Sequence, residues 1–343
     1  MKLSRYGIHR VIEPIGVLPQ AANIIDSNPV CLDNELLIEV DILNIDSASF
    51  HQIKEACNSD IEVMKSMILD IVKSKGKMQN PVTKSGGMLI GSIESIGKEF
   101  HDQSLKVGMK IATLVSLSLT PLHIEEILSI NITNEQVKIK GKAILFDSGI
   151  YAVIPDDLSE KLVLAALDVA GAPAQVKKLA KEGQTVLIIG AAGKSGVLCA
   201  YQAKKNVGAS GKVIGLVNET SQKELLESLG LCDEIILENA LNSLDVYEKV
   251  SLVTSGQLAD VTINVVNVQN TEMTAILSTK DHGIVYFFSM ATSFTKAALG
   301  AEGVGKDLDM MIGNGYTKGH AEITLSILRE SQKLYDLFMK RYA

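Results

Sequence analysis

The chain has 343 residues, a length at which one hydrophobic core usually gives way to two, so we expect one internal domain boundary. Hydrophobic residues make up 46% of it and charged residues 21%, a globular composition that excludes extended disorder. The net charge of -7, with no block of lysine and arginine, gives no electrostatic footprint for nucleic acid or anionic lipid, so small molecules are the expected partners.

The N-terminus and the cysteines bear on the compartment. The opening residues, MKLSRYGIHR, carry charges and lack the apolar core of a secretory signal. No uncharged apolar run approaches the roughly 18 residues of a membrane span. The four cysteines lack the paired spacing of a disulfide framework or a structural zinc site. We therefore expect a cytoplasmic protein.

The first part of the sequence has the composition of β-strands. Runs at 35–43, 88–97, 105–112 and 149–155 are rich in β-branched residues and are bounded by glycine or turn residues. Short strands with irregular connections and few helices predict a small barrel or sandwich.

After Pro155 strands alternate with helical stretches. The expected order is helix 159–179, strand 185–189, helix 196–205, strand 213–217, helix 221–229, strands 234–237, 261–266 and 283–289, and a closing helix at 324–342. This alternation predicts an α/β domain with a doubly wound parallel sheet. We expect this nucleotide domain over 156–309, and a β-rich domain made of 1–155 plus 310–343.

A glycine turn follows the strand at 185–189 and reads VLIIGAAGKSG. A Walker-type loop needs a glycine five residues before its lysine, and the residue five before Lys194 is Ile189, inside the strand. The turn is therefore not a triphosphate loop. Gly190, Gly193 and Gly196 instead have a variant of the dinucleotide spacing, between an apolar strand and a helix.

This turn defines the predicted cofactor site. Lys194 and Ser195 begin the helix, where unpaired N–H groups and the helix dipole favour an anion. The predicted cofactor-binding residues are Gly190, Ala192, Gly193, Lys194, Ser195, Gly196, Asn218, Glu219, Val266 and Ser289.

The choice between NAD and NADP depends on the end of the second strand. Asn218 lies nearest the place where an acidic residue bonds the ribose of NAD, and Glu219 follows it. Asn218 accommodates either cofactor, whereas an inward Glu219 repels a 2′-phosphate. No arginine is present in 217–221, so we expect NAD, with NADP possible.

The β-rich first part, the GAAGxxG loop and the segments Glu35–Phe50 and Gly91–Gly97 together resemble the medium-chain dehydrogenase/reductase superfamily. That resemblance implies a Rossmann-type sheet, a GroES-like catalytic domain and pairing into a homodimer. Two segments, Lys75–Gly91 and Phe287–Gly303, are similar to one member family, the L-erythro-3,5-diaminohexanoate dehydrogenases of bacterial lysine fermentation. This similarity implies a diamino acid substrate.

The chain departs from the zinc-dependent members of the superfamily. The catalytic cysteine position falls on Asp46, and the Gly-His-Glu motif on Gly86, Gly87 and Met88. Catalytic zinc needs three protein ligands, so we expect no metal. An amine, unlike a carbinol, transfers hydride without a Lewis acid once its nitrogen is deprotonated, so the missing zinc ligands favour amine oxidation.

Asp46 and His51 are the candidate catalytic residues, because the superfamily builds its reaction centre there. Asp46 is the first choice for binding or deprotonating an ammonium, and His51 the second for moving its proton. The alternative to a catalytic role for Asp46 is that it only caps a turn or a helix. The alternative for His51 is that it is a surface histidine.

Lys84, Ser85 and Glu302 are the candidate substrate-binding residues. Lys84 and Ser85, beside a glycine pair, suit a carboxylate, and Glu302 suits a distal ammonium. The alternative for Lys84 and Ser85 is a mobile turn without a binding role. The alternative for Glu302 is a carboxylate that is merely solvated on a loop.

The sequence leaves three functions open. The first is NAD(P)-dependent oxidative deamination at C3 of L-erythro-3,5-diaminohexanoate to 5-amino-3-oxohexanoate and ammonia. The second is a zinc-free, NADPH-dependent quinone or enoyl reductase, and the third is a dinucleotide sensor without turnover.

Overall fold

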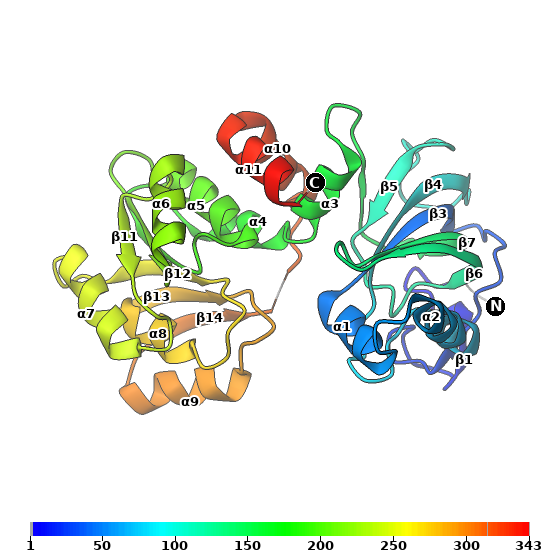
Figure 1. The fold of residues 1–343 in the computed structure, drawn as a ribbon, viewed down its shortest axis with the longest axis horizontal. Coiled ribbons are helices and arrows are strands. Elements are labelled where there is room, and N and C mark those ends of the chain that lie inside the picture. Colours follow the sequence, from blue (N-terminus) through cyan, green and yellow to red (C-terminus); the bar gives the residue numbers. More distant parts are fainter. Residues whose placement is uncertain (1–2, 314, 343) are drawn as a thin grey trace. The chain divides into compact units, whose positions relative to one another are not determined.

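A computed structural model describes residues 3–313 and 315–342 of the chain (Figure 1). The chain divides into two compact units, of which the first ends at Leu158 and the second begins at Ser159. Residues 1–2, 314 and 343, which belong to the predicted domains, lie outside the described residues.

An antiparallel sheet of six strands forms the body of the first unit, in the order β6-β7-β3-β4-β5-β8. These strands are β3 (Glu35–Ile45), β4 (Gly87–Ile96), β5 (Lys110–Thr113), β6 (Leu122–Asn131), β7 (Gln136–Phe146) and β8 (Tyr151–Val153). The 3-10 helix η1 (Ile8–Arg10) and the antiparallel pair β1 (Val11–Glu13) and β2 (Ile24–Ile25) precede the sheet. Apolar side chains of β3 and β7, such as Leu43 and Val137, lie in the core of this unit.

Two helices, α1 (Ser47–Ala56) and α2 (Ile61–Lys75), connect β3 to β4, and the sequence analysis identified neither of them. Asp60 caps α2 by accepting from the N–H groups of Glu62 and Val63, and Gly76 ends it in the left-handed conformation. Such caps are ordinary helix signals. The helix buries Met64, Ile68, Ile71 and Val72, which recur on one face and pack into the core of the strands.

A parallel sheet of six strands forms the centre of the second unit, in the order β11-β10-β9-β12-β13-β14. Its strands are β9 (Thr185–Ile189), β10 (Lys212–Val217), β11 (Glu234–Leu237), β12 (Ala259–Asn264), β13 (Thr279–Phe287) and β14 (Leu308–Ile312). The first strand of this unit, β9, is central and has neighbours reached by crossovers in both directions. This is the doubly wound arrangement that the alternation of strands and helices predicts.

Helices cover both faces of that sheet (Figure 1). The helices are α3 (Glu160–Leu167), α4 (Gly171–Leu179), α5 (Lys194–Val207), α6 (Thr220–Leu229), α7 (Ser243–Val253), α8 (Glu272–Ser278), α9 (Phe294–Val304), α10 (His320–Glu330) and α11 (Gln332–Tyr342). In Figure 1, α4, α5 and α6 lie above the sheet, and α7, α8 and α9 lie below it. The predicted fold class, a Rossmann-type sheet with a β-rich GroES-like part, is confirmed.

The limits of the two parts differ from the expected ones. The division falls three residues after Pro155, and the described residues of 310–343, expected in the β-rich domain, lie in the second unit. The reason is packing: β14 extends the parallel sheet beside β13, and α10 and α11 pack on α3 and α4. The helices expected at 159–179 and 324–342 are each broken into two, near Asp168 and at Ser331.

The helices of both units are short. Within residues 3–313 and 315–342, none combines the length and the apolar character that crossing a membrane demands.

Candidate active site

The glycine turn lies between β9 and α5, at the carboxyl edge of the parallel sheet. Gly190 leaves the strand with φ +85°, a conformation that side chains disfavour. A Cβ on Gly196 would lie 2.2 Å from the Gly190 carbonyl oxygen, so the first turn of α5 packs directly on the end of β9. Gly193 is the N-cap of α5. A Cβ added to it would lie 3.5 Å from its nearest neighbour, the Gly190 carbonyl oxygen, so there is open space beside its backbone. A dinucleotide pyrophosphate requires a turn at which the helix packs closely on the strand and the N–H groups at the helix N-terminus face the ligand. The glycine turn has this geometry.

The remaining predicted cofactor residues lie at the same edge of the sheet. Asn218 and Glu219 follow β10, Val266 follows β12, and Ser289 follows β13. β9 and β12 are neighbours whose chain connections run in opposite directions, so Gly190 and Val266 flank the point where the strand order reverses. An added Cβ on Gly190 would lie 3.0 Å from the Cβ of Val266. Open α/β sheets bind their ligands at this place.

Glu219 is the exposed N-cap residue of α6, but its carboxylate makes no capping hydrogen bond. It accepts only a long bond of 3.4 Å from the Ser221 hydroxyl among the described residues.

Asp46 follows β3 in the first unit and is the N-cap of α1. Its Oδ1 accepts two bonds of 3.0 Å, from the Ser49 N–H and from the Ser85 hydroxyl. Its Oδ2 is buried and has no hydrogen-bond partner among the residues that the structure describes. The helix-cap alternative is therefore present in the structure, but it uses only one carboxylate oxygen.

Three hydroxyl groups gather beside Asp46. The Ser49 Oγ lies 2.6 Å from the Thr83 Oγ1 and 2.9 Å from the Ser85 Oγ, and the Ser85 and Thr83 oxygens are 3.0 Å apart. We refer to Ser49, Thr83 and Ser85 as the hydroxyl cluster. Sequence analysis identified Ser85 but missed Ser49 and Thr83, because their contact joins α1 to a loop more than 30 positions away.

The buried side chain of Asn80 fixes the loop that carries Thr83 and Ser85. Its Oδ1 accepts from the N–H groups of Val82 and Thr83, and its Nδ2 donates to the Gln52 side chain of α1 at 2.7 Å. Its main chain bonds to Ser85 and Lys84 at 3.0 Å each. The loop is thus held to α1 by several hydrogen bonds.

Lys77 anchors the residues before this loop. Its side chain is fully buried, and Nζ donates to the carbonyl oxygens of Pro19 at 2.7 Å and Gln20 at 3.3 Å. Burial, with a smaller effect of Lys75, lowers the pKa of Lys77 to about 8. No sequence signal marked this lysine.

Lys84 lies at the exposed tip of the same loop with φ +62°. Its ammonium forms no hydrogen bond or ion pair with another described residue, so it is available to a carboxylate. Glu302 is exposed on α9 in the second unit, and its carboxylate likewise has no described partner.

His51 is not brought together with Asp46. It is five residues further along α1, which places it about 140° around the helix. Its side chain is 65% exposed, and Nδ1 lies 3.4 Å from the Glu135 carboxylate. The surface alternative for His51 fits this environment.

The residues at the superfamily's zinc position do not form a zinc-binding set. Gly87 has no side chain, and the main chain around it touches that of Asp46, since an added Cβ would lie 2.7 Å from the Asp46 nitrogen. Met88 offers only a buried thioether. Asp46 alone supplies an oxygen ligand, fewer than the three that catalytic zinc needs.

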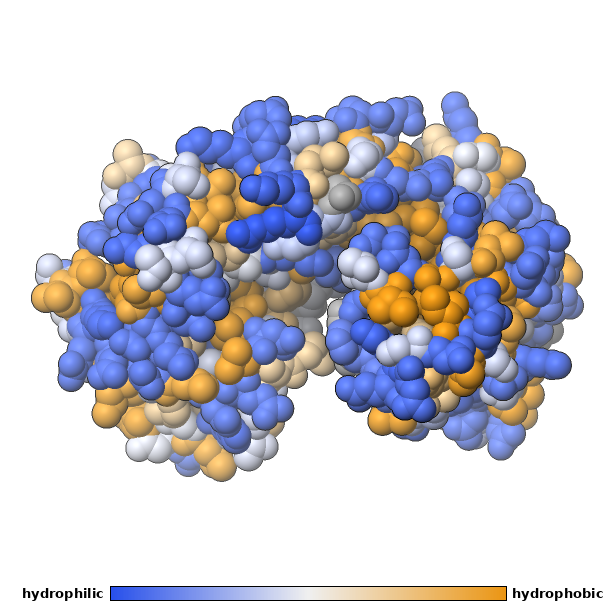
Figure 2. All heavy atoms as spheres, in the orientation of Figure 1, coloured by the Kyte–Doolittle hydropathy of each residue, from blue (hydrophilic) through white to orange (hydrophobic). Residues whose placement is uncertain are grey.

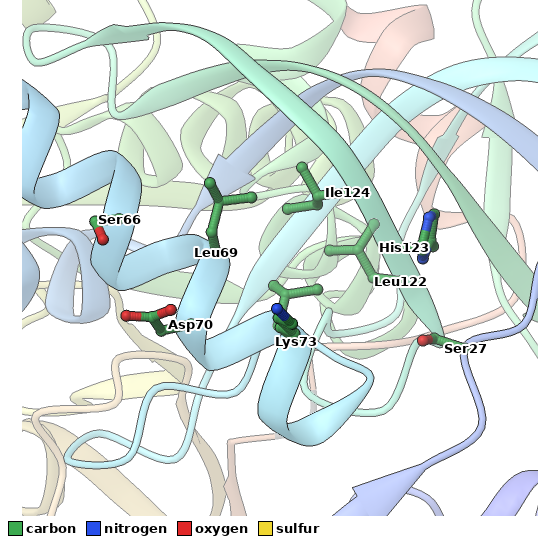
Figure 3. Close-up of a pocket in the computed structure, with 9 residues that line it drawn as sticks. Ser27, Ser66, Leu69, Asp70, Lys73, Leu122, His123 and Ile124 are labelled. Carbon is green, nitrogen blue, oxygen red and sulfur yellow. The ribbon is translucent and has the colours of Figure 1, made fainter.

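A groove of about 470 Å³ lies elsewhere in the first unit, between α2 and β6 (Figure 3). A second cavity of about 460 Å³ lies along α2 and shares Ser66 and Asp70 with the groove. Hydrophobic residues gather around the place of α2 on the face shown in Figure 2. Neither cavity contains a predicted site residue. The groove is lined by Ser27, Ser66, Leu69, Asp70, Val72, Lys73, Leu122, His123 and Ile124.

Solved structures share this fold over most of the chain. An enoyl reductase, CurK, superposes with a TM-score of 0.56 at 17% identity and covers 97% of this chain and 87% of its own. A mycobacterial quinone oxidoreductase gives 0.57 at 17% identity, covering 91% and 86%. The quinone oxidoreductase of Escherichia coli, solved with NADPH, gives 0.51 at 16% identity, covering 94% and 84%. The chain therefore shares the fold of these enoyl and quinone reductases, with its glycine turn at the carboxyl edge of the parallel sheet.

Two curated relatives narrow this class. L-erythro-3,5-diaminohexanoate dehydrogenase of Acetoanaerobium sticklandii is 60% identical over 344 residues, with complete coverage of both chains. The enzyme of that name from Fusobacterium nucleatum is 58% identical over 98% of each chain. Residues 9–155 also match the sequence model of the L-erythro-3,5-diaminohexanoate dehydrogenase N-terminal domain. The chain belongs to the L-erythro-3,5-diaminohexanoate dehydrogenase family and is an oxidoreductase.

Proposed function

We propose that this protein catalyses NAD-dependent oxidative deamination of L-erythro-3,5-diaminohexanoate at C3 in lysine fermentation. The observation that carries the proposal is the 60% identity, over the full length of both chains, to a dehydrogenase of that name. The reaction consumes the diamino acid, NAD+ and water, and yields 5-amino-3-oxohexanoate, ammonium, NADH and a proton. NAD bound at the glycine turn supplies the hydride acceptor, with NADP as a possible substitute.

Asp46 is proposed to bind the reacting ammonium through Oδ2. A buried, unpartnered carboxylate oxygen is costly to maintain unless something else satisfies it. An ammonium, with three donors and a positive charge, is the complementary group. Asp46 then holds the amine in place and is the first acceptor for its proton, whereas His51, exposed and beside Glu135, is the second candidate for moving that proton.

The remaining groups of the substrate need partners of opposite charge. We assign the substrate carboxylate to Lys84, whose ammonium has no partner among the described side chains, with Ser85 beside it. Glu302 is proposed for the ammonium that is retained at C5. No metal takes part in this proposal, because the residues at the zinc position offer one ligand and an amine does not require a Lewis acid.

The direct test is absorbance of reduced nicotinamide when the protein is mixed with 3,5-diaminohexanoate and NAD or NADP in turn. Growth of the NADH band with stoichiometric ammonia supports the proposal. Absence of signal with either cofactor, together with oxidation of NADPH by a quinone or an enoyl thioester, overturns it in favour of the reductase alternative. Cofactor binding without turnover of any of these substrates indicates the sensor.

The role of Asp46 has its own test, with a matched control in the same unit. Asp46→Asn keeps an N-cap, since asparagine caps as well as aspartate, but removes the charge. We expect turnover to fall sharply while NAD affinity is unchanged. Asp60→Asn makes the same change at the cap of α2 and should leave kinetics unaltered. Wild-type turnover in Asp46→Asn would contradict the catalytic role and would show that Asp46 serves only as the N-cap of α1.

Two further expectations belong to the proposal: a cytoplasmic location and a homodimer. Light scattering on the purified protein measures the mass in solution, and a monomeric mass of 36.9 kDa would contradict the dimer.

A further inference from the structure

The hydroxyl cluster contacts one oxygen of Asp46 and leaves the other free. Ser85 donates its hydroxyl to Oδ1 at 3.0 Å, on the same oxygen that accepts the Ser49 N–H. Oδ2 is buried without a partner among the described residues. The two oxygens of this carboxylate therefore have different environments, and the difference arises from residues of α1 and the 80–85 loop.

Counting hydrogens fixes the direction of these bonds. An ionised carboxylate only accepts hydrogen bonds, so the single hydrogen of Ser85 is directed to Asp46. The Ser85 oxygen then accepts from the Ser49 hydroxyl at 2.9 Å, and the Ser49 oxygen accepts from the Thr83 hydroxyl at 2.6 Å. Hydroxyl groups bonded in series polarise one another, which strengthens the final bond to the carboxylate.

We propose that Ser85, Ser49 and Thr83 are positioning residues that hold the Asp46 carboxylate in one orientation, with Oδ2 presented to the substrate ammonium. This inference rests on the proposed function, because it takes the cationic amine as the ligand of Oδ2. Without the cluster, the carboxylate has one remaining donor on Oδ1, the Ser49 N–H, and is free to turn about its χ2 torsion.

The loop itself does not need the hydroxyl groups. Asn80 holds its backbone through Val82, Thr83, Lys84 and Ser85, in bonds that use no hydroxyl. Removing the Ser85 hydroxyl therefore leaves these backbone bonds in place. Removing the Thr83 hydroxyl costs the loop one long bond of 3.4 Å, from the Ser85 N–H. This separation makes the proposal testable by substitution.

The first experiment compares steady-state kinetics of Ser85→Ala, Thr83→Val and Thr83→Ser. Ser85→Ala removes a bond to a charged group, and we expect kcat/KM for the diamino acid to fall at least about tenfold with NAD affinity unchanged. Thr83→Val has the same shape without the hydroxyl, and we expect a loss of about three- to tenfold. Thr83→Ser restores the hydroxyl and should recover most of the activity.

A matched control tests a hydroxyl on a different carboxylate of the same unit. Ser104 donates to Asp102 at 2.6 Å in an exposed turn, and Ser104→Ala should leave kcat/KM at the wild-type value. Equal losses in Ser104→Ala and Ser85→Ala would show a general effect on the unit and overturn the proposal. Wild-type kinetics in both Ser85→Ala and Thr83→Val, with Asp46→Asn impaired, would overturn it as well.

A double-mutant cycle separates this inference from the function on which it rests. If Ser85 acts through Asp46, the loss from Ser85→Ala disappears in the Asp46→Asn background. Multiplicative losses of the two variants would overturn the positioning role while leaving Asp46 as a binding residue. Wild-type kinetics in Asp46→Asn alone would instead overturn the proposed function. Where Ser85→Ala fails to fold, the cycle is run with Thr83→Val against Thr83→Ser.

Discussion

The ammonium of Lys194 lies 2.6 Å from Oδ2 of Asp168, at the beginning of α5 in the second unit. The same ammonium lies 5.5 Å from the centre of the Tyr342 ring. The lysine expected to meet the cofactor pyrophosphate is thus already paired with the residue that ends α3. An anion at the glycine turn and Asp168 therefore compete for one cation.

This competition predicts opposite effects of two substitutions on NAD binding. Asp168→Ala releases Lys194, and we expect the Kd of NAD to decrease about two- to fivefold, whereas Lys194→Ala should increase it by a similar factor. The factors are small because the pair is partly exposed, where such interactions contribute at most about 1 kcal/mol. Calorimetric titration with NAD at low and high salt measures the Kd of each variant. Equal Kd values for wild type, Asp168→Ala and Lys194→Ala would contradict the prediction.

The glycine turn predicts different outcomes for its second and third glycines. Gly196→Ala places a Cβ 2.2 Å from the Gly190 carbonyl oxygen, so we expect a loss of about 1–3 kcal/mol in unfolding free energy. Gly193→Ala meets nothing closer than 3.5 Å and should cost at most about 1 kcal/mol as a poorer cap, but weaken NAD binding because the backbone approaches the pyrophosphate there.

The measurements for these glycines are thermal unfolding and NADH fluorescence, which no tryptophan of this chain obscures. Gly303→Ala, in α9 with no atom within 4 Å of the added Cβ, is the control for both. Unchanged NADH affinity in Gly193→Ala would remove the turn from the cofactor site.

Glu219 predicts the preference between cofactors. Glu219→Gln removes a negative charge from the end of β10, and we expect the affinity for NADP to rise about three- to tenfold, with little change for NAD. Glu224→Gln, an exposed residue of the same helix, removes equal charge one turn further on and serves as the control. Identical ratios of kcat/KM for NADP and NAD in wild type and Glu219→Gln would show that this carboxylate does not face the ribose.

A buried ion pair predicts the acid stability of the first unit. Arg10 donates to Glu35 at 2.9 and 2.6 Å, and His9 lies 2.8 Å from the same carboxylate. Burial raises the pKa of Glu35, but the hydrogen bonds of His9 and Arg10 and the charge of Arg10 outweigh it, so the pKa is lowered below 4.5. The ionised folded form is therefore favoured, and its contribution is present above pH about 4.5 and is lost as the pH falls through the lower folded value.

Unfolding free energies of wild type and Glu35→Gln between pH 3 and pH 7 check this sign. We expect Glu35→Gln to be less stable at pH 7 by about 3 kcal/mol, since it removes the buried charge opposite Arg10 and leaves that guanidinium with Asp26 and the carbonyl oxygens of Asn28 and Val30. It should also show a shallower decline in acid. Arg10→Met with Glu35→Leu should cost less than Glu35→Gln alone. Parallel pH curves for wild type and Glu35→Gln would assign the acid sensitivity to other groups.

The second unit was more predictable from sequence than the first. The structure has the strands Thr185–Ile189 and Glu234–Leu237 at the expected residues. The central strand Thr185–Ile189 is an almost wholly buried apolar run, whereas Glu234–Leu237, at the edge of the sheet, buries only Ile236. The helices α1 and α2 were missed although Asp46, Asp60 and Gly76 provide their caps, because these short local signals lie among strand-forming runs. Strand β7 alternates in burial over its first half and lies between β6 and β3, and its pairing with β3 is a long-range relation that no local motif shows.

Some residues of the candidate site were predictable from the sequence, and others were not. The glycine turn is local, so its spacing and flanking elements predicted its geometry. Asp46 was found through the superfamily position, and its cap was an anticipated alternative. The hydroxyl cluster and Asn80 escaped notice because serine, threonine and asparagine are common turn residues, and their contacts depend on two segments meeting in the folded unit.

The amide of Asn80 has a consequence for the energetics of substrate binding. Because this one side chain ties the 80–85 loop to α1, the loop acquires its shape when the unit folds. The conformational entropy of ordering Thr83 and Ser85 is then charged to folding and not to each encounter with a substrate. The proposed substrate, a small and flexible diamino acid, offers few groups for contact, and a preorganised loop allows those few contacts to give selective binding.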